Sequence, residues 1–208
     1  SSAASDVYKR QDYYSMKKAF LLASILFISV ISTACINNFA VQELNNKAKD
    51  FMDKGDYVSA IERLKSSIDL DGTVFETQYN LAVAYTKAED YANAIKTYND
   101  AIKLNPNFPD AYYSLAVCEE NLAKDIIAGE VTVNEDDTIT KPDEADSEEA
   151  ADKKSLTEND KKMLTTLLNN AISDYMIYKD KNPTADDKAY VEDKVKELQL
   201  LLAQYTVK

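Results

Sequence analysis

The sequence predicts an all-α solenoid, because a 34-residue pattern runs through the middle of the chain. Residues 44–72 and 78–106 align without a gap at an offset of 34. A third copy begins at Pro109, and its second half returns only near Ala171. Units of this length, each too small to bury its own apolar face, are typical of helix pairs that stack on their neighbours. We therefore expect three helix pairs followed by one last helix.

The first two copies share small and bulky residues at equivalent positions. Small residues let helices approach closely, and bulky residues fill the space between them. Two unrelated amphipathic helices are not expected to keep one register over so many positions. The matched pairs are Ala48 with Ala82, Phe51 with Tyr85, Tyr57 with Tyr91, Ala60 with Ala94, Ile61 with Ile95, and Leu64 with Tyr98.

This pattern resembles the tetratricopeptide repeat (TPR), a family whose unit is two antiparallel helices. The second copy carries most of the signature, although Gln78 stands where the family usually has tryptophan. The first copy is weaker, because Lys47, Ser67 and Gly72 occupy slots for leucine, a small residue and proline. The signature residues of the second copy are Leu81, Ala82, Tyr85, Ala94, Tyr98, Ala101 and Pro106. The resemblance implies a right-handed superhelical solenoid of three TPR helix pairs plus a C-terminal capping helix.

An acidic insertion interrupts the third repeat. Residues 130–152 hold ten acidic residues against one lysine, Lys141. We expect this stretch to be disordered or to form a small hairpin from residues 131–133 and 138–140. The expected segments are 41–74 for the first repeat, 75–108 for the second, 109–128 and 155–183 for the two helices of the third, 129–154 for the insertion, and 184–208 for the capping helix.

Helix starts are indicated by capping residues. Thr73 with Glu76, and Ser155 with Glu158, have the spacing of a capping box, and Thr184 is the expected N-cap of the last helix. That helix is expected to cover the open end of the stack, or alternatively to bind a partner with its apolar face. The residues of this face are Ala189, Val191, Val195, Leu198 and Leu202.

The N-terminal region predicts export. Residues 16–34 combine two lysines, a 13-residue apolar run and a small-residue end, as in a signal peptide of the lipoprotein type. The run is shorter than the roughly 20 residues of a spanning helix. Cys35 follows directly and is the expected lipidation site, joined to the first repeat by a linker at 35–40. Residues 1–15 precede the first methionine and are interpreted as a non-native adapter or upstream read-through.

Alternatives remain open for this region. Residues 1–15 could be a genuine polar tail, and the apolar run could be an uncleaved anchor. An ordinary signal peptidase would also cut before Cys35 and leave it without a lipid. The only other cysteine, Cys118, could pair with Cys35 in an oxidising compartment.

The composition excludes several kinds of chemistry. The 208 residues include 24 Lys and Arg, 36 Asp and Glu, and no histidine, which excludes His-based triads and imidazole metal ligands. Without residues 1–34 the net charge falls from −12 to −14, and phosphate contacts need dense Lys and Arg. No Walker, Rossmann or EF-hand spacing is present. We therefore expect no enzyme activity, no metal, no cofactor and no nucleic-acid partner.

What remains is a binding surface. The resemblance implies that the first helices of the repeats line a concave groove for a peptide or helix. The groove residues expected from the alignment are Asn45, Lys49, Met52, Tyr79, Val83, Lys87, Tyr113, Val117 and Glu120. The tyrosines and valines suit an apolar or amphipathic peptide, unless they pack within the protein. Two lysines do not make the basic constellation of a carboxylate clamp.

These features predict a non-catalytic protein-interaction scaffold of the bacterial cell envelope. We expect it to be exported, held at a membrane by a lipid on Cys35, and exposed to the periplasm or the cell surface. An alternative is a cation- or polymer-responsive surface protein, in which the acidic insertion binds and the repeats serve as a rigid support.

Overall fold

The computed structural model describes residues 17–18, 20–24, 38–141, 155–181 and 185–206. Cys35, Thr184 and residues 142–154 lie outside the described part, as do twelve of the 19 residues of the predicted signal peptide, namely 16, 19 and 25–34. The main helices are 38–53, α2 (Tyr57–Leu70), α3 (Phe75–Lys87), α4 (Tyr91–Leu104), α5 (Pro109–Ala128), α6 (Glu158–Lys181) and α7 (Ala185–Thr206), with strands β1 (Thr132–Val133) and β2 (Ile139–Thr140) between α5 and α6. Residues 17–18 and 20–24 are helical as well. The all-α solenoid predicted from the sequence is confirmed.

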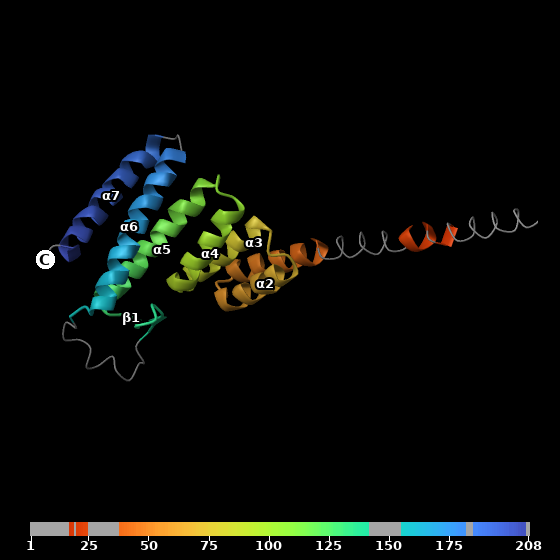
Figure 1. Cartoon of the computed structure of the whole chain (residues 1–208), viewed down its shortest axis with the longest axis horizontal. Helices are drawn as coiled ribbons and strands as arrows, with labels where there is room; N and C mark the ends of the chain where they lie inside the picture. Colours follow the sequence, from red (N-terminus) through yellow and green to blue (C-terminus); the bar gives the residue numbers. More distant parts are fainter. Residues whose placement is uncertain (1–16, 19, 25–37, 142–154, 182–184, 207–208) are drawn as a thin grey trace, which may run out of the picture.

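The helices stack in the order of the chain. Each one from α2 to α7 packs mainly against its predecessor and its successor, so that α5 lies between α4 and α6 (Figure 1). Helix 38–53 and α2 form the first pair, α3 and α4 the second, and α5 and α6 the third. Helix α7 packs on α6 at the far end, where the stack would otherwise expose apolar surface. No described helix combines the length and apolar character needed to span a membrane.

The turns inside the first two pairs have the same construction. Asp56 and Asp90 are N-caps, and their carboxylates accept bonds from the backbone nitrogens of Ser59 and Asn93. The residue before each cap has a positive φ, 75° at Gly55 and 56° at Glu89. Glycine adopts this left-handed conformation without a side-chain clash, whereas Glu89 adopts it as a non-glycine residue.

Two apolar clusters form the core. The N-terminal cluster joins the first two pairs around Leu64, Leu81 and Tyr98, and it extends to Leu115 of α5. The C-terminal cluster joins α5, α6, α7 and the hairpin. Its residues include Leu122, Ile126, Val131, Val133, Leu164, Leu168, Tyr175, Val191 and Leu198. Helix α4 contacts both clusters through Tyr91, Ile95 and Ile102.

The first part of the insertion forms an antiparallel hairpin. Thr132 pairs with Thr140 and Val133 with Ile139, and the buried side chain of Val133 joins the C-terminal cluster. The Val133 backbone nitrogen donates to Asp160 of α6 at 3.2 Å. An isolated hairpin of this size is marginal, so its attachment to α6 explains why it forms here.

Two predicted capping boxes are wrong. Helix α6 begins at Glu158, three residues after the start of the expected segment, and its capping box is Thr157 with Asp160. Thr157 N donates to Asp160 Oδ2 at 2.9 Å, and Asp160 N donates to Thr157 Oγ1 at 3.1 Å. Asp160, rather than Glu158, is the acid of the capping box, because Asp160 also accepts the hydrogen bond from Val133 N of the hairpin. Helix α3 has Val74 as its N-cap, without a side-chain bond. Thr73 instead bonds to Asp71.

The last helix caps the stack, with one difference from the expected face. Val191 and Leu198 are buried in the C-terminal cluster, and Val195 and Leu202 pack against it. Ala189 is exposed, because the apolar contact of α7 begins only at Val191.

Candidate functional site

The nine predicted groove residues lie on the first helices of the three pairs: helix 38–53, α3 and α5. This set is called the groove face below. In the first pair, Lys49 is exposed and Met52 is half-buried against the N-terminal cluster. Asn45 donates from Nδ2 to Thr77 Oγ1 of α3 at 2.8 Å, which links the first two repeats. Its Oδ1 atom is buried without a hydrogen-bond partner among the described residues.

In the second pair, Lys87 is exposed and Val83 is half-buried against the N-terminal cluster. Tyr79 lies in an aromatic cluster that the sequence did not reveal, with Phe75 at 5.8 Å and Phe108 at 5.2 Å between ring centroids. All three rings are half-exposed. Phe75 and Phe108 stand at the starts of α3 and α5, where the repeat signature assigns no aromatic residue.

In the third pair, the groove-face residues contact other parts of the protein. The Tyr113 ring packs at 5.7 Å from Tyr175 and 5.1 Å from Tyr178, both on α6. The Tyr113–Tyr175 contact repeats the Tyr79–Tyr98 contact of the second pair, which also measures 5.7 Å. Both groove-face tyrosines, Tyr79 and Tyr113, therefore pack against a ring of the second helix of their own repeat.

Glu120 differs most from the expected open groove, since it is only 4% exposed. Its Oε1 accepts Lys124 at 2.6 Å and Lys194 of α7 at 2.9 Å, and its Oε2 accepts the Tyr175 hydroxyl at 3.0 Å. Burial opposes ionisation of Glu120, but these bonds outweigh it and hold its pKa below the ordinary value. Glu120 thus anchors the capping helix.

A buried carboxyl pair lies beside this network. Glu119 of α5 is 2% exposed, faces Asp174 and Asn170 of α6, and has an Oε2 atom without a hydrogen-bond partner among the described residues. Burial, and then the charge of Asp174, raise the pKa of Glu119 to about 9, and burial raises that of Asp174 to about 6. The pair therefore retains a proton at neutral pH.

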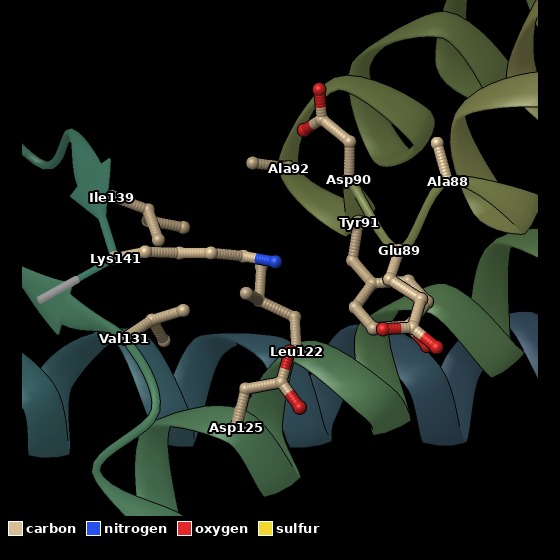
Figure 2. Close-up of a pocket in the computed structure, with 10 residues that line it drawn as sticks. All are labelled: Ala88, Glu89, Asp90, Tyr91, Ala92, Leu122, Asp125, Val131, Ile139 and Lys141. Atoms are coloured by element: carbon tan, nitrogen blue, oxygen red, sulfur yellow. The ribbon is translucent and has the colours of Figure 1, made fainter. Parts of the chain in front are cut away.

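A cavity of about 290 Å³ lies where the hairpin meets the turn between α3 and α4 (Figure 2). Its lining comes from three parts of the chain: the turn, α5 and the hairpin. The lining residues are Ala88, Glu89, Asp90, Tyr91, Ala92, Leu122, Asp125, Val131, Ile139 and Lys141. No sequence pattern predicted this cavity, because its lining combines the insertion with the turn of the second repeat.

The second helix pair and its junction with the third match a known repeat. The family model described as TPR repeat matches residues 84–118, from α3 through α4 into α5. The chain carries a tetratricopeptide repeat. In TPR terms, the cavity lies at the turn inside the second repeat, and the groove face lies on the first helices of the repeats. Among curated proteins, none matches the sequence.

Solved structures of TPR domains share the fold at low identity. The first TPR of Spaghetti (RPAP3), solved with the HSP90 peptide SRMEEVD, is 18% identical with a TM-score of 0.52, covering 78% of this chain and 93% of that chain. The second TPR domain of human RPAP3, solved with the HSP70 peptide SGPTIEEVD, is 19% identical with a TM-score of 0.53, covering 77% and 98%. SycD, a type III secretion translocator chaperone of Yersinia enterocolitica, is 12% identical with a TM-score of 0.52, covering 77% and 84%.

The TPR fold accounts for the unusual position of Glu119. At offsets of 34 residues it is equivalent to Phe51 and Tyr85, the bulky packing residues of the first two repeats. The sequence alone could have indicated this, because Glu119 stands where the other repeats have an aromatic packing residue. An acid at such a position indicates either a distorted repeat or a protonated side chain. Cys118, its neighbour, is a fully buried free thiol, and burial raises its pKa to about 11.

Proposed function

We propose that this protein is a non-catalytic scaffold of the bacterial cell envelope, anchored to a membrane by a lipid on Cys35. It binds a peptide or helix of a protein partner on the groove face. The observation that supports the proposal is a set of half-exposed apolar residues, Met52, Tyr79 and Val83, on the same two helices as the exposed Lys49 and Lys87. Such a combination suits one face of an amphipathic peptide.

The fold supports the same kind of partner. RPAP3 TPR domains were solved with peptides of HSP90 and HSP70 that end in Glu-Glu-Val-Asp. The groove face here offers two exposed cations, which are too few for a carboxylate clamp. We therefore propose apolar side chains as the main contact, with acidic groups of the partner near Lys49 and Lys87. Glu120 takes no part in this binding, because α7 occupies it.

Reversing the charge of the groove face should abolish partner capture. Lys49→Glu with Lys87→Glu places two negative charges beside the proposed apolar contact, while both side chains are exposed and leave the core intact. We expect a crosslinking pull-down from envelope extracts to lose at least about 90% of the specific partner, which is more than 1.4 kcal/mol of binding free energy. Alanine at Tyr79 or Tyr113 is less informative, because those rings also pack within repeats.

The matched control is Lys96→Glu with Lys103→Glu on α4, a second helix of a repeat. Both lysines are exposed, and the net charge changes by the same amount. Equal loss with the control pair would indicate a general charge effect, and full retention with the groove-face pair would refute binding there.

Replacing Cys35 by serine should move the protein out of the membrane fraction. The lipid would attach to the thiol, and acyl chains hold a protein to a membrane without a spanning helix. Intact-mass analysis of the wild type should give a chain beginning at Cys35 plus acyl groups, and the variant should lack that added mass. Cys118→Ser is the control, because Cys118 is buried in the core. A wild-type mass without acyl groups would refute the anchor.

A further inference from the structure

We propose that the cavity between the α3–α4 turn and the β-hairpin binds a lysine side chain presented by a protein ligand (Figure 2). None of the nine groove-face residues lines this cavity. The inference therefore goes beyond the proposed peptide binding and does not rest on it.

The size of the cavity fits a single side chain. Its volume of about 290 Å³ lies just below the range of roughly 300–1,000 Å³ found for small-molecule sites. The cavity is partly open, so a side chain projecting from another protein can enter while its backbone stays outside.

The walls are suited to an alkyl stem. Leu122 and Val131 are buried residues of the C-terminal cluster, and the half-buried Ile139 packs against that cluster. A methylene chain lying on them would exchange contact with water for contact with apolar groups, at roughly 0.8 kcal/mol per buried CH₂. The four-carbon stem of lysine can use this wall while its charged end reaches polar groups.

The charge of the cavity favours a cation. Glu89 and Asp125 contribute carboxylates, and neither forms an ion pair with another described residue. Asp90 is engaged in capping α4 through Asn93. Burial is the largest cause of the raised pKa of Asp125, and the nearby charges of Glu130 and Glu89 raise it further. The Tyr91 ring offers a further contact to an ammonium group.

Lys141 shows which ligand chemistry the cavity accepts. Figure 2 shows its stem running between Ile139 and Val131, with the ammonium group directed across the cavity toward the turn. No ion pair joins Lys141 to the described residues, and its charge lowers the pKa of Asp125. The chain's own lysine thus lies along the path proposed for the ligand's lysine. The two cations would compete for the same carboxylates.

The test is an NMR titration of the full-length protein with N-acetyl-lysine methylamide. We expect saturable shifts of the backbone amides of residues 88–92 and 131–133, with a Kd of about 1 mM, which corresponds to roughly 4 kcal/mol. N-acetyl-norleucine methylamide has the same stem without the ammonium group and should bind at least about tenfold more weakly.

Three variants of the protein sharpen the test. Glu89→Gln with Asp125→Asn should weaken binding of the lysine probe at least about tenfold, because the attraction is removed. Lys141→Met keeps the stem and removes the competing charge, so binding should strengthen about threefold. Glu135→Gln is the control, since it neutralises an exposed acid of the hairpin turn outside the cavity, and it should change Kd less than about twofold.

Three results would overturn the proposal. They are an absence of saturable shifts at the cavity amides, equal binding of the lysine and norleucine probes, and weaker binding by Lys141→Met. Circular dichroism of each variant distinguishes lost binding from lost structure. Because Lys49 and Lys87 stay unchanged in all of them, failure here leaves partner capture by the groove face intact.

Discussion

Replacing Glu120 by alanine should lower the free energy of unfolding by about 3 kcal/mol and loosen helix α7. The change leaves the Tyr175 hydroxyl and the Lys194 ammonium group without their acceptor, and removing one member of a buried pair costs roughly 3–5 kcal/mol. The lower end applies because the Lys194 and Lys124 side chains are 20% and 52% exposed. Urea unfolding measures the loss, and hydrogen exchange locates it in α7.

Glu197 provides the matched control for this experiment. It contacts the same Lys194 at 3.3 Å, but its side chain is 61% exposed. Glu197→Ala should therefore change stability by less than about 0.5 kcal/mol. If the two alanine variants were equally stable, Glu120 would not be the anchor of the capping helix.

Glu119→Gln should stabilise the protein at alkaline pH, by on the order of 2 kcal/mol at pH 8. The folded pKa of Glu119, about 9, lies above the ordinary glutamate value of 4.5, and that of Asp174, about 6, lies above the ordinary aspartate value of 3.8. Between about pH 4 and about pH 9 this carboxyl pair therefore binds more protons in the folded protein than in the unfolded chain. The free energy of unfolding thus decreases as pH rises from about 4 to about 9, and glutamine removes the larger part of that slope.

Urea midpoints of the wild type and the variant between pH 5 and pH 9 test this expectation. The difference between the two proteins matters, because other carboxyl groups contribute equally to both. Glu62→Gln, which neutralises an exposed acid of α2, is the control and should leave the slope unchanged. Parallel curves for the wild type and Glu119→Gln would mean that the pair is not a shared-proton site.

The sequence contained the repeat architecture because packing imposes the same residue types every 34 positions. Ala48 with Ala82, and Ala60 with Ala94, are fully or almost fully buried where helices meet. Helix ends were less predictable. Several polar residues compete to cap a helix, and tertiary contacts decide among them, as the bond from Val133 to Asp160 does for α6.

The candidate site was only partly predictable. Residues on the first helices could be assigned from the register, and Lys49 and Lys87 are exposed there. The burial of Glu120 depends on Lys194, which lies 74 residues away on a helix whose docking the register does not specify. The cavity depends likewise on the insertion, which has no counterpart in the other repeats.

Helix α4 couples the unfolding of the N-terminal cluster to that of the C-terminal cluster. Because Tyr91, Ile95 and Ile102 contact both apolar clusters, neither half can unfold without disturbing the other. A stack of weakly joined repeats melts in stages, whereas shared side chains favour one transition. A ligand that binds only the folded form, at either end, then raises the melting temperature of the entire chain. A ligand bound at one end of the stack therefore also stabilises the helices at the other end against unfolding.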